Sequence, residues 1–493
     1  MIGSARGDAV LRADPITLTL GAIAPSTSPT SWARCTWSTA LCALLQSIRS
    51  RLPRKQPQWE EAMADVIETH VMRRVAWRLV PFLGLGYYVN ALDRSNIAIA
   101  ALTMNKSLGF TAAEYGLGAG AFFWSYVLFQ VPANMLLARL GARRWLSIII
   151  LAWALCSGAT ALVTGVTSFV VVRFLLGVAE AGYFSGVIFF LTCWFPDRYR
   201  GRAMGVFYAF AAAAVSTGAP ISGNILALHG WLGLQGWQWI FVLEAAPAVI
   251  LAAIAPFVLR DRPADADWLK PEERAWLQTT LDAEQRSGVG RQKPQFEALR
   301  SIPVVLMTIA YVLIGFGVYA NVFFLPLMIK DLGFSNIVTS YLAALPAALG
   351  VLGMIVVSRS SDRTGERVWH VTVCTLVAGI GLVLAGLTTG DKVAELLSLC
   401  LVGFFISAAL PTFWNLPTAY FGPGIAAAGI AMINSIGNLA GYFAPQLVGV
   451  LRDWSGNYSL ALLVVGVMAL LAAVLLPFAG APARAAQLRR AAV

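Results

Sequence analysis

Apolar residues recur along the chain in runs of about 20 positions or more, and short polar segments separate them. An α-helix rises about 1.5 Å per residue and needs about 20 residues to cross roughly 30 Å of hydrocarbon, so such runs can span a bilayer. The predicted fold class is therefore an all-α membrane protein. Twelve transmembrane helices are predicted, at residues 76–98, 113–137, 145–165, 168–193, 203–228, 237–259, 302–329, 337–358, 368–388, 394–417, 425–450 and 458–479.

The spans form two sets of six around a polar middle segment, and the two sets resemble each other. Gly141 in "ARLGARR" corresponds to Gly365 in "SDRTGER", 224 residues further on, and Pro220 corresponds to Pro445, 225 residues further on. Matches at nearly one offset indicate a parallel repeat of two six-helix bundles. In transporters built this way, the binding site lies near the middle of the membrane, between two bundles that rock around it.

The pattern divides the chain into five segments. Residues 1–62 are rich in Ser, Thr, Pro, Ala and Arg and hold no run long enough to span. We expect them to be a disordered extension, or the result of a start assigned too early, with Met63 as the alternative start. In the middle segment, "LKPEERAWLQTTLDAEQ" places Pro271 and two glutamates where a helix begins, which predicts a short helix. The other segments are an N-terminal half at 63–260, a cytoplasmic middle loop at 261–300, a C-terminal half at 301–480 and a cytoplasmic tail at 481–493.

Composition and charge agree with a membrane protein. Apolar residues make up 58% of the chain and charged residues 12%, whereas a soluble protein is about half apolar and a quarter charged. Lys and Arg gather in the loops on the side of both termini, and this placement accounts for the net charge of +11 without a nucleic-acid partner. Because basic loops stay in the cytoplasm, we expect a multi-pass protein of the bacterial cytoplasmic (inner) membrane with both termini inside. The opposite loops hold Lys106, Lys330, Lys392 and Arg452.

Motifs for enzymatic chemistry are missing from the sequence. It contains no GxxxxGK followed by Ser or Thr, no HExxH and no GxSxG. The six cysteines and three histidines show no metal-binding or redox spacing. We therefore predict no enzymatic activity, no cofactor and no metal site. Transport would draw its energy from an ion gradient or from none.

Charged residues occur inside two predicted spans. The stretch "SFVVVRFLLGVAEAG" places Arg173 and Glu180 seven residues apart, on one helix face and about 10.5 Å apart along the axis. Span one contains Asp93 and Arg94. Each charge costs about 2.5–3.5 kcal/mol at the bilayer centre, so charges there usually mark a transport pathway. Two arginines against one deeper carboxylate leave positive charge that suits a substrate carboxylate. The alternative is that these charges only pair with one another and hold helices together.

Polar and aromatic residues of span one and of the second half could complete a cavity. They are Tyr87 in span one, Tyr319 in span seven, Asn415 in span ten and Asn438 in span eleven. Amides within spans also form hydrogen bonds between helices, so helix packing is the alternative interpretation. The glycine spacings in "GLGAG" and "GNLAG" predict surfaces where two helices pack closely.

Several longer stretches resemble a known family. "ALDRSNIAIAALTMNKSLGF", "RFLLGVAEAGYF", "WFPDRYRGRAMG" and "GWQWIFVLEAAPA" are similar to the anion:cation symporter family of the major facilitator superfamily, and the likeness runs from about residue 70 to residue 480. Within that family the chain looks most like bacterial tartrate, phthalate and hydroxyphenylacetate permeases. The resemblance implies that Arg94 and Asn438 contact the substrate. It also implies that Glu180, paired with Arg173, couples proton binding to transport. We regard Asp93 of span one as a second candidate for proton coupling.

The resemblance further implies gating by two cytoplasmic loops. The residues concerned are Arg139 and Arg143 in "ARLGARR" and Asp362 and Arg363 in "SDRTGER". The first loop lacks the acidic residue that the wider superfamily places there, whereas the second keeps it as Asp362.

Residues and resemblance together predict a secondary transporter that imports a small organic acid anion by proton symport and alternating access. We expect a carboxylate substrate, protons as the coupling ion, a lipid bilayer as the surroundings and a monomer. Proton binding at Glu180 is expected to release Arg173 for the anion. Sodium remains an alternative coupling ion.

Two other functions stay open. A facilitator of a sugar or neutral solute would not account for two buried arginines. A membrane sensor that binds an acid without moving it usually carries a signalling domain, and no polar segment of this sequence is long enough for one.

Overall fold

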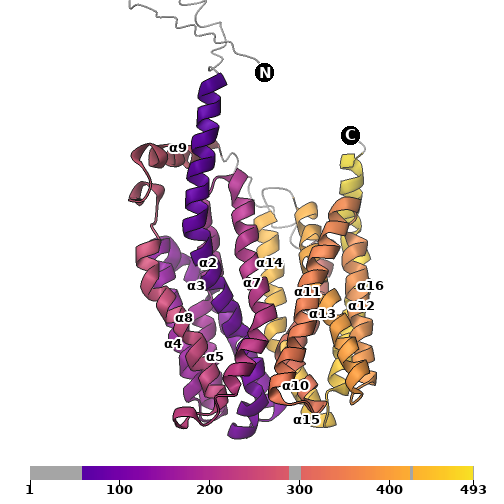
Figure 1. The fold of residues 1–493 in the computed structure, drawn as a ribbon. Helices are drawn as coiled ribbons and strands as arrows, with labels where there is room; N and C mark the ends of the chain where they lie inside the picture. Colours follow the sequence, from indigo (N-terminus) through magenta and orange to yellow (C-terminus); the bar gives the residue numbers. More distant parts are fainter. Residues whose placement is uncertain (1–57, 288–300, 422–425, 492–493) are drawn as a thin grey trace, which may run out of the picture. The chain divides into compact units, whose positions relative to one another are not determined.

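The computed structural model describes residues 58–287, 301–421 and 426–491, and the regular elements in these ranges are all helical (Figure 1). The first half contains α2 (Gln58–Leu108), α3 (Ala112–Leu140), α4 (Ala142–Ala159), α5 (Val166–Glu180), α6 (Tyr183–Trp194), α7 (Asp197–Leu226) and α8 (Gly236–Val258). The middle loop contains α9 (Pro271–Ser287). The second half contains α10 (Ile302–Asp331), α11 (Asn336–Thr364), α12 (Val368–Leu387), α13 (Lys392–Tyr420), α14 (Ala426–Asn438), α15 (Ala440–Ser455) and α16 (Ser459–Ala491).

Residues Val66–Val493 form one compact unit, and all contacts reported below lie within it. The prediction for residues 1–62 falls outside the described residues, except that residues 58–62 begin α2. The predicted helix of the middle loop is confirmed as α9, which starts at Pro271 and has two glutamates in its first turn. The segment predicted as a tail, 481–493, is helical as far as Ala491.

Ten of the predicted spans are, within the described ranges, long and apolar enough to cross a membrane. One of them, span four, combines α5 and α6. The other two predicted spans are α2, which carries Arg78, Asp93 and Arg94, and the pair α14–α15, which is interrupted at Leu439. The all-α membrane fold of two six-helix bundles is therefore confirmed.

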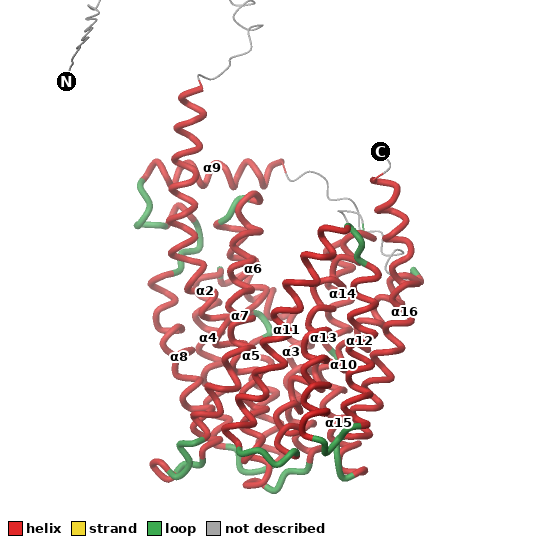
Figure 2. The backbone as a smooth tube through the Cα atoms, turned by 45° about the vertical axis from the view of Figure 1, so that its right-hand side comes forward, coloured by secondary structure: helices red, strands yellow, loops and turns green. Residues whose placement is uncertain are grey.

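The packing of the helices follows the predicted repeat. In the first half α3 packs on α5 and α4 packs on α8, and in the second half their repeat counterparts α11 and α13, and α12 and α16, pack in the same way. Figures 1 and 2 show the two sets of helices next to each other. Between the halves, α3 packs along α15 and α7 packs along α11. The repeat relates span two (α3) to span eight (α11), and span five (α7) to span eleven (α14–α15). The α3–α15 contact is therefore the repeat counterpart of the α11–α7 contact.

Hydrogen bonds join the two halves at the end of the bundle opposite α9, which we call the far end. There α2, α7, α10 and α15 finish, and α3 and α11 begin. The Asp453 carboxylate accepts hydrogen bonds from the backbone N–H groups of Ala112 (3.1 Å) and Ala113 (2.8 Å), and so caps the start of α3. The Tyr115 hydroxyl donates to the Phe323 carbonyl at 3.1 Å.

Glycines allow α3 and α15 to approach each other closely. A Cβ atom at Gly116 would meet the carbonyl oxygen of Pro445, and one at Gly120 would lie 2.7 Å from the carbonyl oxygen of Tyr442. On α15, a Cβ at Gly441 would lie 2.5 Å from the Phe123 ring. The prediction that "GLGAG" and "GNLAG" are close-packing surfaces is confirmed.

Candidate functional site

The helix of span four is broken directly after Glu180. α5 ends at Glu180, and α6 begins at Tyr183 after two residues in a turn. Trp145 of α4 donates from its indole nitrogen to the Gly182 carbonyl at 3.4 Å, and a Cβ at Gly182 would lie 2.8 Å from the same ring. This close packing of Trp145 on Gly182 marks the break. Interrupted helices of this kind commonly form the binding sites of transporters.

Glu180 forms an ion pair with Arg94 of α2. The Glu180 side chain is fully buried, and its Oε2 lies 2.7 Å from Arg94 Nε. A carboxylate at the C-terminal end of a helix meets the negative end of the helix dipole, so it needs a cation nearby. The Arg94 guanidinium also lies over the rings of Tyr126 (4.8 Å) and Phe122 (5.2 Å). The partner of Glu180 is thus Arg94, and not Arg173 on the same helix.

Arg173 is buried without a hydrogen-bonding partner. Its side chain is only 1% exposed, and none of its three guanidinium nitrogens has a partner among the described residues. The guanidinium carbon lies 5.2 Å from the centre of the Phe122 ring, the same distance as that of Arg94. A buried cation without acceptors is unfavourable. The site therefore holds guanidinium N–H donors for which no described protein group serves as a hydrogen-bond acceptor.

Asp93 is held by α4 and not by a basic residue. Its Oδ2 accepts a hydrogen bond from the indole nitrogen of Trp153 at 2.9 Å, and its Oδ1 accepts one from the Ser157 hydroxyl at 2.7 Å. The side chain is buried. These bonds tie α2 to α4 and fix the backbone that carries Arg94 next to Asp93.

Aromatic contacts connect this cluster to the second half. Phe123 follows Phe122 on α3, and its ring lies 4.6 Å from that of Tyr319 on α10. The Tyr319 hydroxyl donates a hydrogen bond to Asn438 Oδ1 at 3.2 Å. Asn438 is the last residue of α14, so the second interrupted span also breaks at a candidate site residue. The structure thus brings Arg94, Arg173, Glu180 and Asn438 into one connected cluster between the halves.

Two other predicted site residues, Tyr87 and Asn415, form no hydrogen bond with this cluster within the described ranges. Tyr87 is close enough to Arg94 on α2 for the two side chains to interact electrostatically. Tyr87 stacks on Phe207 of α7, with ring centres 4.4 Å apart and planes within 7°. It also lies beside Phe184 and Tyr208, so it belongs to an aromatic cluster of α2, α6 and α7. Asn415 is half-buried on α13, and within the described ranges its side chain forms no hydrogen bond with the Arg94 cluster.

The predicted gating residues lie at the end of the bundle that carries α9. Arg139, Asp362 and Arg363 are exposed there. The backbone N–H of Arg143 donates to Asp261 Oδ1 at 2.8 Å. Asp261, which follows α8, therefore places a carboxylate at the loop "ARLGARR", which has none of its own. The gating role of these residues stays a prediction.

Glu244 of α8 is a buried carboxylate that was not among the predicted site residues. Its Oε1 accepts a hydrogen bond from the Ser222 hydroxyl of α7 at 2.6 Å, and the buried Asn96 side chain of α2 lies beside it. The sequence contains the signal for this site, because Glu244 is a carboxylate within the apolar run "GWQWIFVLEAAPA".

A connected polar cluster therefore lies between two six-helix halves that are related by a repeat. The family model of the Major Facilitator Superfamily matches residues 83–445. The chain belongs to the major facilitator superfamily.

Relatives within the superfamily cover most of the chain. Two proteins of Agrobacterium vitis, whose names propose tartrate transport, are 43% and 42% identical over 84% and 83% of this chain and 95% and 91% of their own. The inner membrane transport protein RhmT of Escherichia coli (strain K12) is 37% identical over 78% of this chain and 89% of its own. The predicted resemblance to tartrate permeases is confirmed, and these relatives are transporters and not enzymes.

Solved structures with the same fold include a bacterial homologue of the human lysosomal transporter Spinster in an inward-facing, unoccupied conformation. It has a TM-score of 0.66 and 18% identity, over 84% of this chain and 97% of its own. The D-xylose–proton symporter has a TM-score of 0.66 and 15% identity, over 81% and 97%. At these identities the likeness establishes the fold alone. The protein is thus a multi-pass membrane transporter of the superfamily, whose members take small molecules.

Proposed function

We propose that the protein imports a small organic acid anion together with protons. The observation that carries this proposal is the buried Arg173 guanidinium, whose three nitrogens have no hydrogen-bond partner in the described residues. A substrate carboxylate supplies two acceptor oxygens in one plane, which matches the donors of a guanidinium. The A. vitis relatives named for tartrate transport support a substrate of this class.

Arg94 provides a second place for an acidic group. Its bond to Glu180 uses Nε, and its side chain is 31% exposed, so the two terminal nitrogens remain for a ligand. Both arginines lie at the Phe122 ring. A diacid of the size of tartrate presents a carboxylate at each end, and hydroxyl groups between them suit the Tyr319–Asn438 pair. The cluster therefore favours a hydroxylated dicarboxylate over a neutral sugar.

Glu180 is the proposed proton carrier. When Glu180 is ionised, Arg94 neutralises it; when a proton binds, the carboxyl no longer holds Arg94, which becomes free for the anion. This differs from the expectation drawn from the sequence, in which Glu180 released Arg173. Each negative charge that enters an inside-negative cell works against about 2.3 kcal/mol per 100 mV, so the membrane potential drives accumulation only when the number of protons exceeds the number of negative charges on the anion.

Transport by alternating access would open and close the far end. We propose that the far end faces the outside, because its loops hold few basic residues while the α9 end holds many. In the present conformation Asp453 caps α3 there, and α15 packs on Gly116 and Gly120. The same orientation puts both termini in the cytoplasm. Opening to the outside requires these contacts to separate.

Uptake of labelled tartrate into proteoliposomes tests the function. With the outside more acidic, the wild-type protein should concentrate tartrate, and a protonophore should abolish the accumulation. Unlabelled phthalate or tartrate should compete, whereas the neutral tartaric diamide should not. Competition by the diamide would favour the neutral-solute facilitator, and tartrate binding without uptake would favour the sensor. Replacing sodium by choline should change nothing; loss of uptake would assign the coupling to sodium.

A further inference from the structure

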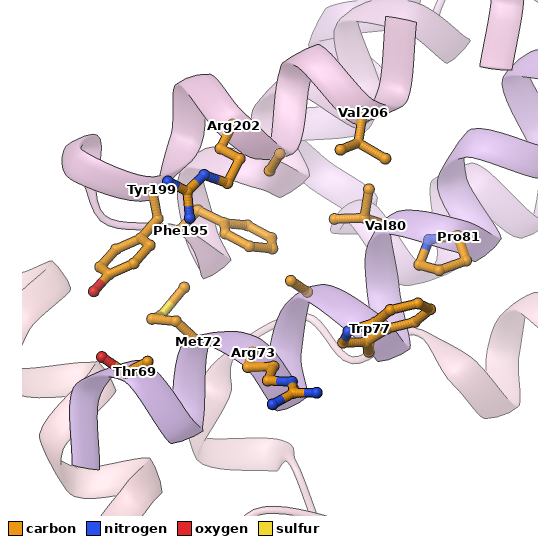
Figure 3. A pocket seen from close by; sticks show the side chains of 12 residues that line it. Thr69, Met72, Arg73, Trp77, Val80, Pro81, Phe195, Tyr199, Arg202 and Val206 are labelled. Carbon is orange, nitrogen blue, oxygen red and sulfur yellow. The ribbon is translucent and has the colours of Figure 1, made fainter. Parts of the chain in front are cut away.

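A groove of ≈ 550 Å³ lies between α2 and the α6–α7 segment, away from the Arg94 cluster (Figure 3). Figure 3 shows the side chains of α2 on one wall and those that follow α6 on the other. Most of the lining is apolar, including Met72, Val80 and Pro81 of α2 and Phe195 and Val206 on the opposite wall. An apolar lining of this kind suits a hydrocarbon chain better than a small polar solute.

The groove lies at the level of the membrane–water boundary. Trp77, which lines it, is 73% exposed. Exposed tryptophans of membrane proteins concentrate at the level of the lipid headgroups, because the ring is apolar and its N–H is polar. The same part of α2 is bound to α9, since Arg74 pairs with Glu273 at 3.0 Å. The groove thus opens where the bundle meets the headgroups on the α9 side.

The arginines around the groove are of two kinds. Four of the six at this end of α2 and α7 have protein partners: Arg74 pairs with Glu273, Arg78 lies 5.1 Å from the Trp268 ring, Arg198 pairs with Glu68 at 3.3 Å and Arg200 pairs with Asp197. The other two, Arg73 and Arg202, are exposed and form no ion pair within the described part of the chain. Both line the groove, Arg73 on the α2 wall and Arg202 on the opposite wall (Figure 3).

We propose that this groove binds an anionic phospholipid. One acyl chain occupies the apolar groove, and the guanidinium groups of Arg73 and Arg202, on its two walls, attract the phosphate. Guanidinium binds phosphate oxygens through paired hydrogen bonds, and basic pockets between transmembrane helices at the cytoplasmic side bind anionic headgroups in this manner. The lipid would join α2, which carries Arg94, to α7. This inference rests on the groove alone and not on the proposed substrate.

Native mass spectrometry of the delipidated full-length protein tests the proposal. Phosphatidylglycerol and phosphatidylcholine with the same acyl chains are titrated in turn. The wild-type protein should bind one phosphatidylglycerol more tightly than any phosphatidylcholine. The double variant Arg73→Gln, Arg202→Gln should lose on the order of 10- to 30-fold in apparent affinity for that lipid, the effect of two surface arginines. The double variant Arg144→Gln, Arg359→Gln, with the same change in net charge at exposed positions of the α9 end, should bind as the wild type does.

Two further arms separate a lipid from other ligands. Val206→Trp fills the groove and leaves both arginines in place, so it should also weaken phosphatidylglycerol binding. Inorganic phosphate at millimolar concentration should not displace the lipid. Equal affinity of the Arg73, Arg202 variant and its control would overturn the proposal. So would equal binding of phosphatidylcholine, or displacement by phosphate alone. Thermal unfolding of each variant in detergent micelles confirms that it is folded.

Discussion

Arg173→Met should stabilise the unliganded protein and weaken its affinity for substrate. The Arg173 side chain is 1% exposed, and its nitrogens lack partners in the described residues. Replacing buried ionic groups by apolar residues of similar volume commonly stabilises a protein by about 1–4 kcal/mol. Methionine has a comparable unbranched shape, and its sulfur contacts aromatic rings favourably, so it can keep the contact with Phe122. We therefore expect an increase in the free energy of unfolding.

The effect of the same substitution on binding has the opposite sign. Truncating one partner of a buried, hydrogen-bonded charge pair costs about 2–5 kcal/mol of binding free energy. Since about 1.4 kcal/mol corresponds to a factor of ten, the Kd for tartrate should rise by roughly 30- to 4,000-fold.

Thermal unfolding of the purified protein in detergent, with and without tartrate, measures both effects. In the wild type, tartrate should raise the unfolding midpoint. Arg173→Met should begin at a higher midpoint that tartrate does not change. Arg144→Met replaces an exposed arginine outside the site and should show neither effect. A variant of Arg173 that is less stable without ligand, yet still responds to tartrate, would refute the reasoning.

Three further substitutions test the surroundings of the site. Asp93→Asn should lower the free energy of unfolding by about 1–3 kcal/mol. The amide NH2 group would replace one of the two accepting oxygens, for instance the one that now accepts from Trp153 at 2.9 Å. Unchanged stability would contradict the assignment of both Asp93 oxygens as acceptors. Tyr319→Phe removes the donor to Asn438 and should weaken tartrate binding less than about tenfold, the effect of one neutral hydrogen bond; a loss beyond a hundredfold in a titration would make Tyr319 a direct anchor. Gly116→Val forces α3 away from α15. The variant should take up tartrate more slowly, while its Kd for tartrate stays within about twofold of the wild-type value. An unchanged uptake rate would contradict closure of the far end by this contact.

The charged residues of the site could be predicted from the sequence. Arg94, Arg173 and Glu180 are recognisable because lipid makes an uncompensated charge unfavourable, whatever the fold around it. In the structure both arginines lie at the Phe122 ring, and Glu180 binds Arg94. The twelve spans follow from the same physics, since run length and apolarity depend only on the chain and the bilayer.

The pairing of the charges could not be predicted from their spacing. Helical periodicity places Arg173 and Glu180 on one face, but the ion pair is decided by α2, which presents Arg94 to Glu180. The break after Glu180 depends in the same way on Trp145, whose ring packs on Gly182. Such contacts join segments that are far apart in the sequence, and periodicity carries no information about them.

Transport by Glu180→Gln tests the central claim most directly. Glutamine keeps the size of the side chain and fixes it in the neutral state, so Arg94 stays free for the anion whatever the pH. In proteoliposomes with the outside more acidic, the variant should no longer concentrate labelled tartrate, because it has lost the proton carrier. It should still exchange labelled for unlabelled tartrate between equal pools at a rate near that of the wild type. A variant that still concentrates tartrate against its gradient would contradict the account.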